Sequence, residues 1–210
     1  MDKIEKIVYI NLERRKDRRE EIEREFRRME IPQEKLVRFE AIPHSHGLTG
    51  CGQSHRRVLE IAKEEGWKNV LILEDDFDFV VSKEEWEESL HYFFHKMENR
   101  PWDVLMISYN IGNHGNYVIP FEEDTKIGKI GYAQTASGYL VNQHYYDTLI
   151  QNLNEGNPLL ELTKYHWIYA NDVYWKKLQE RDNWFYFIKR IGIQRESFSD
   201  NSGVITNYQC

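Results

Sequence analysis

Short apolar runs recur along the chain and are separated by longer segments with a helical spacing of apolar residues. The runs KIVYINL and NVLIL contain no regular alternation with polar residues, which is typical of strands covered on both faces. The same reasoning predicts strands over 6–12, 36–42, 69–73, 103–109, 139–141 and 184–188.

Helices are predicted between these strands. In the segment 13–30, Ile22, Phe26 and Met29 form a narrow apolar stripe. Ser82 and Glu85 have the spacing of a capping box in front of a helix. Further helices are predicted over 83–98, 143–153 and 171–180.

Another helix is predicted over 55–65, between the second and third strands. Ser54 is expected to cap its start, and Gly66 is expected to end it. The Gly- and His-rich segment 44–52 before it is expected to be a loop.

The order of these elements predicts the fold class. Strands and helices alternate through the first half, which favours an α/β fold with a mostly parallel sheet and helices on both faces. We find no internal repeat and no linker, so 1–210 is interpreted as a single domain. Ligands of such sheets bind beyond the carboxyl ends of the strands.

Composition and charge narrow the classes of partner. Hydrophobic residues make up 40% and charged residues 30%, a balance typical of a soluble globular protein. The net charge of -7 argues against a nucleic-acid partner, since such binding depends on cationic side chains. No signal peptide and no transmembrane segment is predicted, so we expect a cytoplasmic location.

Four carboxylates follow the third predicted strand directly: Glu74, Asp75, Asp76 and Asp78. Such crowding is unfavourable unless a cation compensates, and oxygen ligands suit Mg²⁺ or Mn²⁺. In an extended chain Glu74, Asp76 and Asp78 share a face, and Asp75 points elsewhere, toward a ribose or a backbone N–H. The alternative interpretation is an acidic turn in solvent.

Six blocks, in order, resemble glycosyltransferase family 25, the lipopolysaccharide-biosynthesis and collagen-galactosyltransferase family. They are KIVYINLERRKDRREEI, GCGQSHRRVLEIA, VLILEDDFDF, TASGYLVNQHYYDTLI, NDVYW and QRESFSDN. The resemblance implies a GT-A (Rossmann-like) fold and an inverting transfer that depends on Mn²⁺ (or Mg²⁺). It implies a UDP-hexose donor carrying galactose or glucose. The acceptor would be a hydroxyl of a glycan or of a hydroxylysine-type protein.

The same resemblance implies roles for individual residues. Asp172 would be the general base, and Asp76 the metal ligand, with Asp78 competing for the metal and Asp200 closing over it. The donor would contact Asn11, Leu12, Arg15, Arg18, Ser54, His55, Glu74, Asp75 and Ser137.

The remaining aromatic residues and Cys51 are interpreted by their position. Cys51 is expected to be a small packed residue, not a nucleophile. Trp67, Trp86 and Trp102 are predicted to lie in the core, whereas Trp167, Trp175 and Trp184 are predicted to meet a sugar.

Two other functions are compatible with these features. One is a nucleotide-sugar-binding module without turnover. The other is a metal-dependent phosphohydrolase or nuclease that uses the carboxylates between Glu74 and Asp78, although the net charge disfavours a nucleic-acid substrate.

Overall fold

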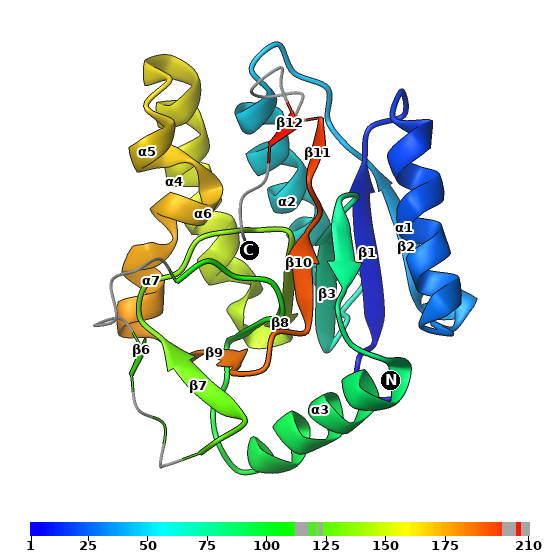
Figure 1. The fold of residues 1–210 in the computed structure, drawn as a ribbon. Coiled ribbons are helices and arrows are strands. Elements are labelled where there is room, and N and C mark those ends of the chain that lie inside the picture. Colours follow the sequence, from blue (N-terminus) through cyan, green and yellow to red (C-terminus); the bar gives the residue numbers. More distant parts are fainter. Residues whose placement is uncertain (112–117, 120, 122–123, 199–204, 207–210) are drawn as a thin grey trace.

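The protein is built on one eight-stranded sheet with the strand order β2-β1-β3-β8-β5-β9-β7-β6 (Figure 1). The computed structural model describes residues 1–111, 118–119, 121, 124–198 and 205–206. The strands of this sheet are β1 (Lys6–Asn11), β2 (Leu36–Glu40), β3 (Asn69–Glu74), β5 (Val104–Met106), β6 (Val118–Ile119), β7 (Ile127–Ile130), β8 (Gly138–Asn142) and β9 (Trp184–Phe187). Strands β8 and β7 run against the other six, so the expected mostly parallel α/β sheet is confirmed.

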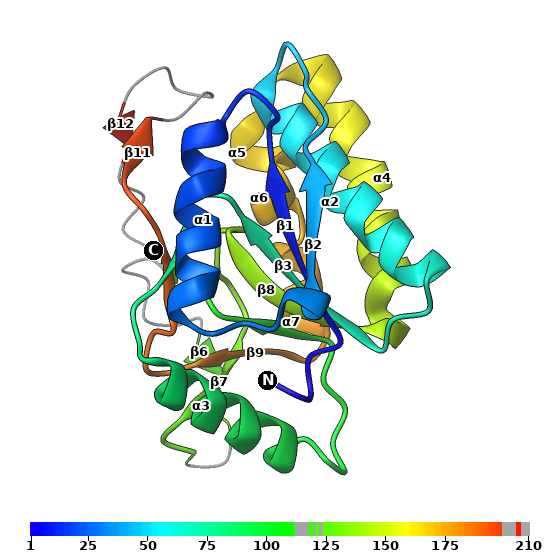
Figure 2. The ribbon, with the colours of Figure 1, turned by 90° about the vertical axis from the view of Figure 1, so that its right-hand side faces the viewer.

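Helices cover both faces of the sheet. They are α1 (Lys16–Arg28), α2 (Gly47–Glu64), α3 (Lys83–Lys96), α4 (Tyr146–Thr163), α5 (His166–Tyr169), α6 (Asn171–Tyr174) and α7 (Lys176–Arg181), with 3₁₀ turns at Gln33–Lys35 and Gln143–Tyr145. Figure 2 shows α1 on one side of β1 and β2, and α2 and α4 on the other.

Side-chain alternation along the strands produces two separate apolar cores. Ile7 and Tyr9 of β1 pack with the stripes of α1 and α3, whereas Val8 and Ile10 pack with α2 and α4. This double burial explains why the strands carry no polar alternation. Trp67, Trp86 and Trp102 are buried as expected.

The start of α2 differs from the prediction. The helix begins at Gly47, so the expected loop 44–52 is mostly helical and Ser54 lies inside the helix instead of capping it. Its hydroxyl donates to the carbonyl of Gly50 at 2.7 Å and accepts from the N–H of Ile42 at 2.9 Å. The glycines lower helix propensity, but they allow close packing: a Cβ on Gly50 would lie 2.6 Å from the Ile42 oxygen.

A small second sheet joins residues 192–194 to residues 77–79, which follow the acidic turn 74–76. β4 (Phe77–Phe79) pairs antiparallel with β10 (Gly192–Gln194), and the N–H of Arg195 donates to the carbonyl of Asp76 at 2.7 Å. A third sheet consists of two antiparallel strands, β11 (Ser197–Phe198) and β12 (Ile205–Thr206). The long-range pairing of β4 with β10 was not predicted.

Among the described residues, no helix combines the length and the apolar character that crossing a bilayer requires.

Candidate functional site

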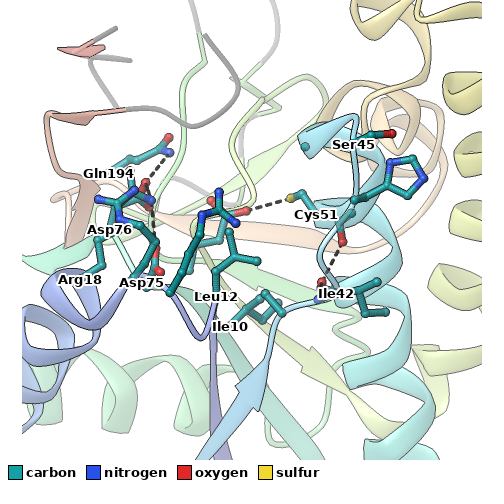
Figure 3. A pocket seen from close by; sticks show the side chains of 17 residues that line it. Ile10, Leu12, Arg18, Ile42, Ser45, Cys51, Asp75, Asp76 and Gln194 are labelled. Atoms are coloured by element: carbon teal, nitrogen blue, oxygen red, sulfur yellow. Dashed lines mark hydrogen bonds and ion pairs between the residues drawn. The ribbon is translucent and has the colours of Figure 1, made fainter. Parts of the chain in front are cut away.

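A pocket of about 340 Å³ opens beyond the carboxyl ends of β1, β2 and β3 (Figure 3). Its walls come from the segments that follow each of these strands, from the first turns of α2, and from Gln194 of β10. Six of the predicted donor-contacting residues line it, together with Asp76: Leu12, Arg15, Arg18, Ser54, Glu74 and Asp75. The position agrees with the general location of ligands in α/β sheets.

Asp75 is held by groups from β1 and α1. Its carboxylate accepts from Asn11 Nδ2 at 2.7 Å and from Arg18 at 3.0 Å. Arg18 also lies 3.1 Å from Asp76, so one guanidinium pairs with two carboxylates. Burial nevertheless raises the pKa of Asp75, against the opposing charge of Arg18.

Asp76 is the least satisfied carboxylate of the turn. Its Oδ2 accepts from Gln194 at 3.2 Å, but its buried Oδ1 has no hydrogen-bond partner among the residues that the structure describes. Burial and the nearby charge of Glu74 raise the pKa of Asp76 to about 7. A buried, unpartnered carboxylate oxygen beside other acids is a fitting ligand for Mg²⁺ or Mn²⁺.

Glu74 lies in a different environment from Asp76. Its Oε1 accepts from His55 Nε2 at 3.0 Å and from the Cys51 thiol at 3.2 Å. Burial acts to raise the pKa of Glu74, but these two donors and the charge of His55 outweigh it, and the pKa is lowered. Glu74 is therefore the ionised partner when Asp76 retains a proton.

Asp78 is separated from the other three acids, and the prediction of one shared face is wrong. The chain turns at Asp75 and Asp76 instead of staying extended. Asp78 sits in the middle of β4 and accepts from Arg195 at 2.7 Å. It lines neither pocket described here.

A second pocket, of about 740 Å³, adjoins the first and shares Cys51, Glu74 and Gln194 with it. Asp172 and Trp167 line this second pocket. It is enclosed by the start of α2, the segments around Asn110 and Thr135, and the short helices α5 and α6.

Asp172 is fixed in the second pocket by the backbone. Its Oδ2 accepts from the N–H of Thr135 at 3.1 Å. Thr135 has a φ of 88°, an unusual conformation for a β-branched residue, and such conformations concentrate at functional sites. Burial raises the pKa of Asp172, which favours its acting as a proton acceptor near neutral pH.

Several predicted residues lie elsewhere. His55 stands behind Glu74, and its Nδ1 lies 2.8 Å from the hydroxyl of Tyr139. Ser137 is buried, bonds to Ser108 at 2.8 Å and lines neither pocket. Asp200 lies outside the described residues.

The tryptophans of the second half are only partly as expected. Trp175 and Trp184 are buried in the core, so the prediction that they meet a sugar is wrong. They pack on each other with ring centroids 5.2 Å apart. Trp167 is 60% exposed and lies on the second pocket. Gln194 lines both pockets, but the sequence analysis gave it no role, although it is the first residue of the block QRESFSDN.

Comparison with known proteins gives structural matches alone. No protein-family model and no curated protein matches the sequence. Solved structures that match include A197 from STIV (9% identity, 98% of this chain and 100% of that chain, TM-score 0.45). A mannose-1-phosphate geranyltransferase from Thermus thermophilus also matches (11% identity, 92% of this chain and 74% of that chain, TM-score 0.46). So does mouse xyloside xylosyltransferase 1 (9% identity, 84% of this chain and 69% of that chain, TM-score 0.43).

Proposed function

We propose that the protein is a metal-dependent glycosyltransferase, with a nucleotide-sugar donor in the first pocket and an acceptor in the second. The observation that carries this proposal is the meeting of the two pockets at Glu74, with an unpartnered Asp76 oxygen on one side and Asp172 on the other. A two-substrate transfer needs such a junction, because the reacting atoms of both substrates must come together.

The first pocket supports a donor with a diphosphate. Leu12 and Ile42 offer apolar surface for a base, and Arg15 and Arg18 offer positive charge for phosphates. Asp76, with Glu74, would hold Mn²⁺ (or Mg²⁺). When bound, the cation would supply charge neutralisation for the departing diphosphate. We propose a UDP-hexose donor, in line with the resemblance to glycosyltransferase family 25.

The second pocket supports a hydroxyl acceptor. Asp172 would take the proton of the acceptor hydroxyl as its oxygen bonds to the anomeric carbon and the bond from that carbon to the diphosphate oxygen breaks. A single displacement of this kind inverts the anomeric configuration. The exposed ring of Trp167 would stack on a sugar of a glycan acceptor. A hydroxylysine-type protein acceptor uses the same chemistry.

The test measures metal-dependent hydrolysis of a panel of UDP-hexoses, followed by transfer to glycan acceptors. Asp76→Asn should lower both rates by more than about 100-fold. Asp172→Asn should lower transfer by roughly 10²–10⁴-fold while leaving nucleotide binding unchanged. Asp147→Asn, an exposed carboxylate paired with Lys63, is the matched control and should retain activity.

The same measurements separate the alternatives. Binding of nucleotide and metal without hydrolysis or transfer would indicate a binding module. Release of phosphate from simple esters without a sugar donor would indicate a phosphohydrolase. Wild-type turnover by Asp76→Asn would remove the metal from the proposal.

A further inference from the structure

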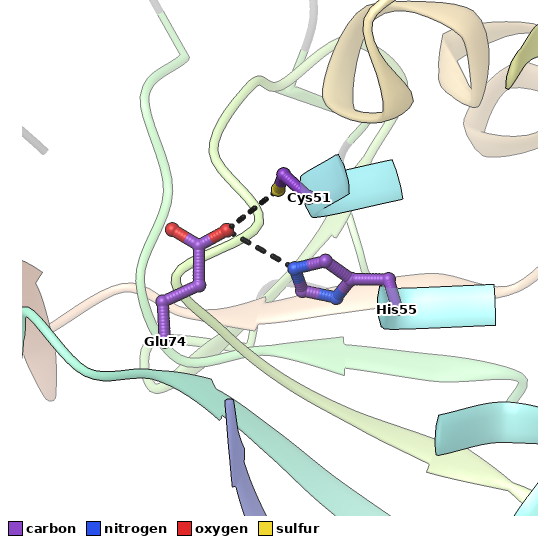
Figure 4. A group of neighbouring side chains, drawn as sticks. All are labelled: Cys51, His55 and Glu74. Carbon is purple, nitrogen blue, oxygen red and sulfur yellow. Dashed lines mark hydrogen bonds and ion pairs between the residues drawn. The ribbon is translucent and has the colours of Figure 1, made fainter. Parts of the chain in front are cut away.

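Three different ligand atoms converge at the junction of the two pockets. Cys51 and His55 are four residues apart on α2, so both face the end of β3, where Glu74 lies (Figure 4). Their sulfur, nitrogen and oxygen atoms all lie within 4.8 Å of one another. Two of the separations are 3.2 Å, from sulfur to Glu74 Oε1, and 3.0 Å, from His55 Nε2 to the same oxygen.

This donor set differs from the oxygen ligands of a magnesium or manganese site. A thiolate, an imidazole and a carboxylate together suit Zn²⁺, which binds such ligands at about 2.0–2.3 Å in tetrahedral geometry. Tetrahedral bonds of that length place ligand atoms roughly 3.3–3.7 Å apart. The cluster is thus close to the required spacing before any metal enters, and two of its members, Cys51 and Glu74, line both pockets.

Neighbouring groups orient the ligands as outer partners of a metal site do. The Tyr139 hydroxyl, which is fully buried, lies 2.8 Å from His55 Nδ1. Asn171 Nδ2 lies 3.9 Å from the Cys51 sulfur. Burial and the charges of Glu74, Asp172 and Asp76 raise the pKa of Cys51 well above its ordinary value, and the same negative field favours a divalent cation.

We propose that Cys51, His55 and Glu74 form a zinc site, and that zinc bound there inhibits transfer by occupying the junction and engaging Glu74. On binding, the Cys51 thiol gives its proton to solvent. His55 binds through Nε2 with its N–H on Nδ1, where the Tyr139 oxygen accepts it, so zinc binding releases at least the Cys51 proton. The zinc site does not depend on the proposed function. Only the inhibition of transfer by zinc rests on that function.

The first test titrates the full chain with Co²⁺, as a spectroscopic substitute for zinc, and with Zn²⁺ by calorimetry, without nucleotide. Co²⁺ should give a thiolate charge-transfer band in the near ultraviolet and the visible bands of a tetrahedral site. Cys51→Ser should abolish the thiolate band and weaken zinc binding by more than the roughly 10–100-fold that loss of an outer partner causes. Tyr139→Phe should weaken it by about that 10–100-fold. Cys210→Ser, which removes the only other cysteine of the chain, should leave the spectrum unchanged.

A thiolate band that persists in Cys51→Ser, or one lost in Cys210→Ser, would overturn the site, as would wild-type protein that binds no zinc. Calorimetry in buffers of different ionisation enthalpy should detect release of the Cys51 proton on zinc binding, a readout that needs no variant. Zinc should inhibit the wild type but not Cys51→Ser, each compared with its own zinc-free rate. Absence of transferase activity in every protein would overturn the proposed function instead, and the titrations would still decide the zinc site.

Discussion

Asp76 is the residue at which stability and the proposed chemistry conflict. Its buried Oδ1 meets no hydrogen-bond donor in the described part of the chain, and burial with the charge of Glu74 raises the pKa of Asp76 to about 7. The metal-free folded protein therefore retains a proton that the unfolded chain has already released. Between the ordinary value of 3.8 and about pH 7, stability falls as the pH rises.

Asp76→Asn should therefore stabilise the metal-free protein while abolishing transfer. In EDTA at pH 8 we expect its free energy of unfolding to rise by about 1–3 kcal/mol, because the buried charge is gone. The difference in stability between pH 5 and pH 8 should shrink in parallel. Urea unfolding at both pH values measures this, with Asp147→Asn as the exposed control. Equal pH dependence in Asp76→Asn and the wild type would contradict the raised pKa.

At the level of single residues, the sequence predicted which acidic side chains belong to the site but not which side chains they bind. The acidic cluster was predicted from its position after a buried strand, and Asp75 and Asp76 do line the first pocket. The bond of Asp75 to Asn11 spans 64 positions, and that of Asp78 to Arg195 spans 117. No local pattern encodes such pairs, because they depend on how distant segments meet in the folded sheet.

At the scale of the elements, the start of α2 was predicted wrongly: the helix begins at Gly47 and not at residue 55. Glycines at 47, 50 and 52 predict a loop by propensity, yet all three are helical. Gly50 is packed against the Ile42 carbonyl and Gly52 against Asn157 of α4. Tertiary packing overrides propensity here, whereas β1, β3 and α3 were predictable because local pattern and packing agree.

Gly50→Ala should disturb the first pocket through the backbone. The new Cβ would lie 2.6 Å from the Ile42 oxygen and 2.9 Å from His44 Cβ, so the pocket wall must move. We expect a loss of about 1–3 kcal/mol in unfolding free energy and weaker nucleotide binding by calorimetry. Gly66→Ala is the control: its φ of +68° costs about 1 kcal/mol, but no atom lies near its Cβ and nucleotide binding should be retained. Wild-type nucleotide affinity in Gly50→Ala would argue against donor binding at this wall.

Helix α3 offers a stability test far from the chemistry. The Ser82 side chain accepts from the N–H of Glu85, and the Glu85 side chain accepts in return from the N–H of Ser82. Ser82→Ala should cost about 0.5–2 kcal/mol in urea unfolding. Ser89→Ala removes a hydroxyl within the same helix that caps nothing, and it should cost less. Equal losses in the two variants would mean that the capping box contributes little.

At the scale of the whole molecule, the shared wall of the two pockets predicts the kinetic pattern. The proposed transfer requires donor and acceptor to be bound together, since Asp172 and Asp76 line adjoining pockets that share Glu74. Initial rates with both substrates varied should give intersecting lines in double-reciprocal plots. Parallel lines would instead indicate a covalent glycosyl-enzyme intermediate and would contradict direct displacement.

The pairing of β10 with β4 also sets the order in which the site matures during synthesis. Residues 74–76 leave the ribosome long before Gln194 and Arg195, which bind the Asp76 side chain and backbone. A nascent chain that ends before Gly192 lacks the partner of β4 and also Gln194, which lines both pockets. Because contacts of such sequence separation form late, the acidic turn reaches its final shape only after β10 has been translated.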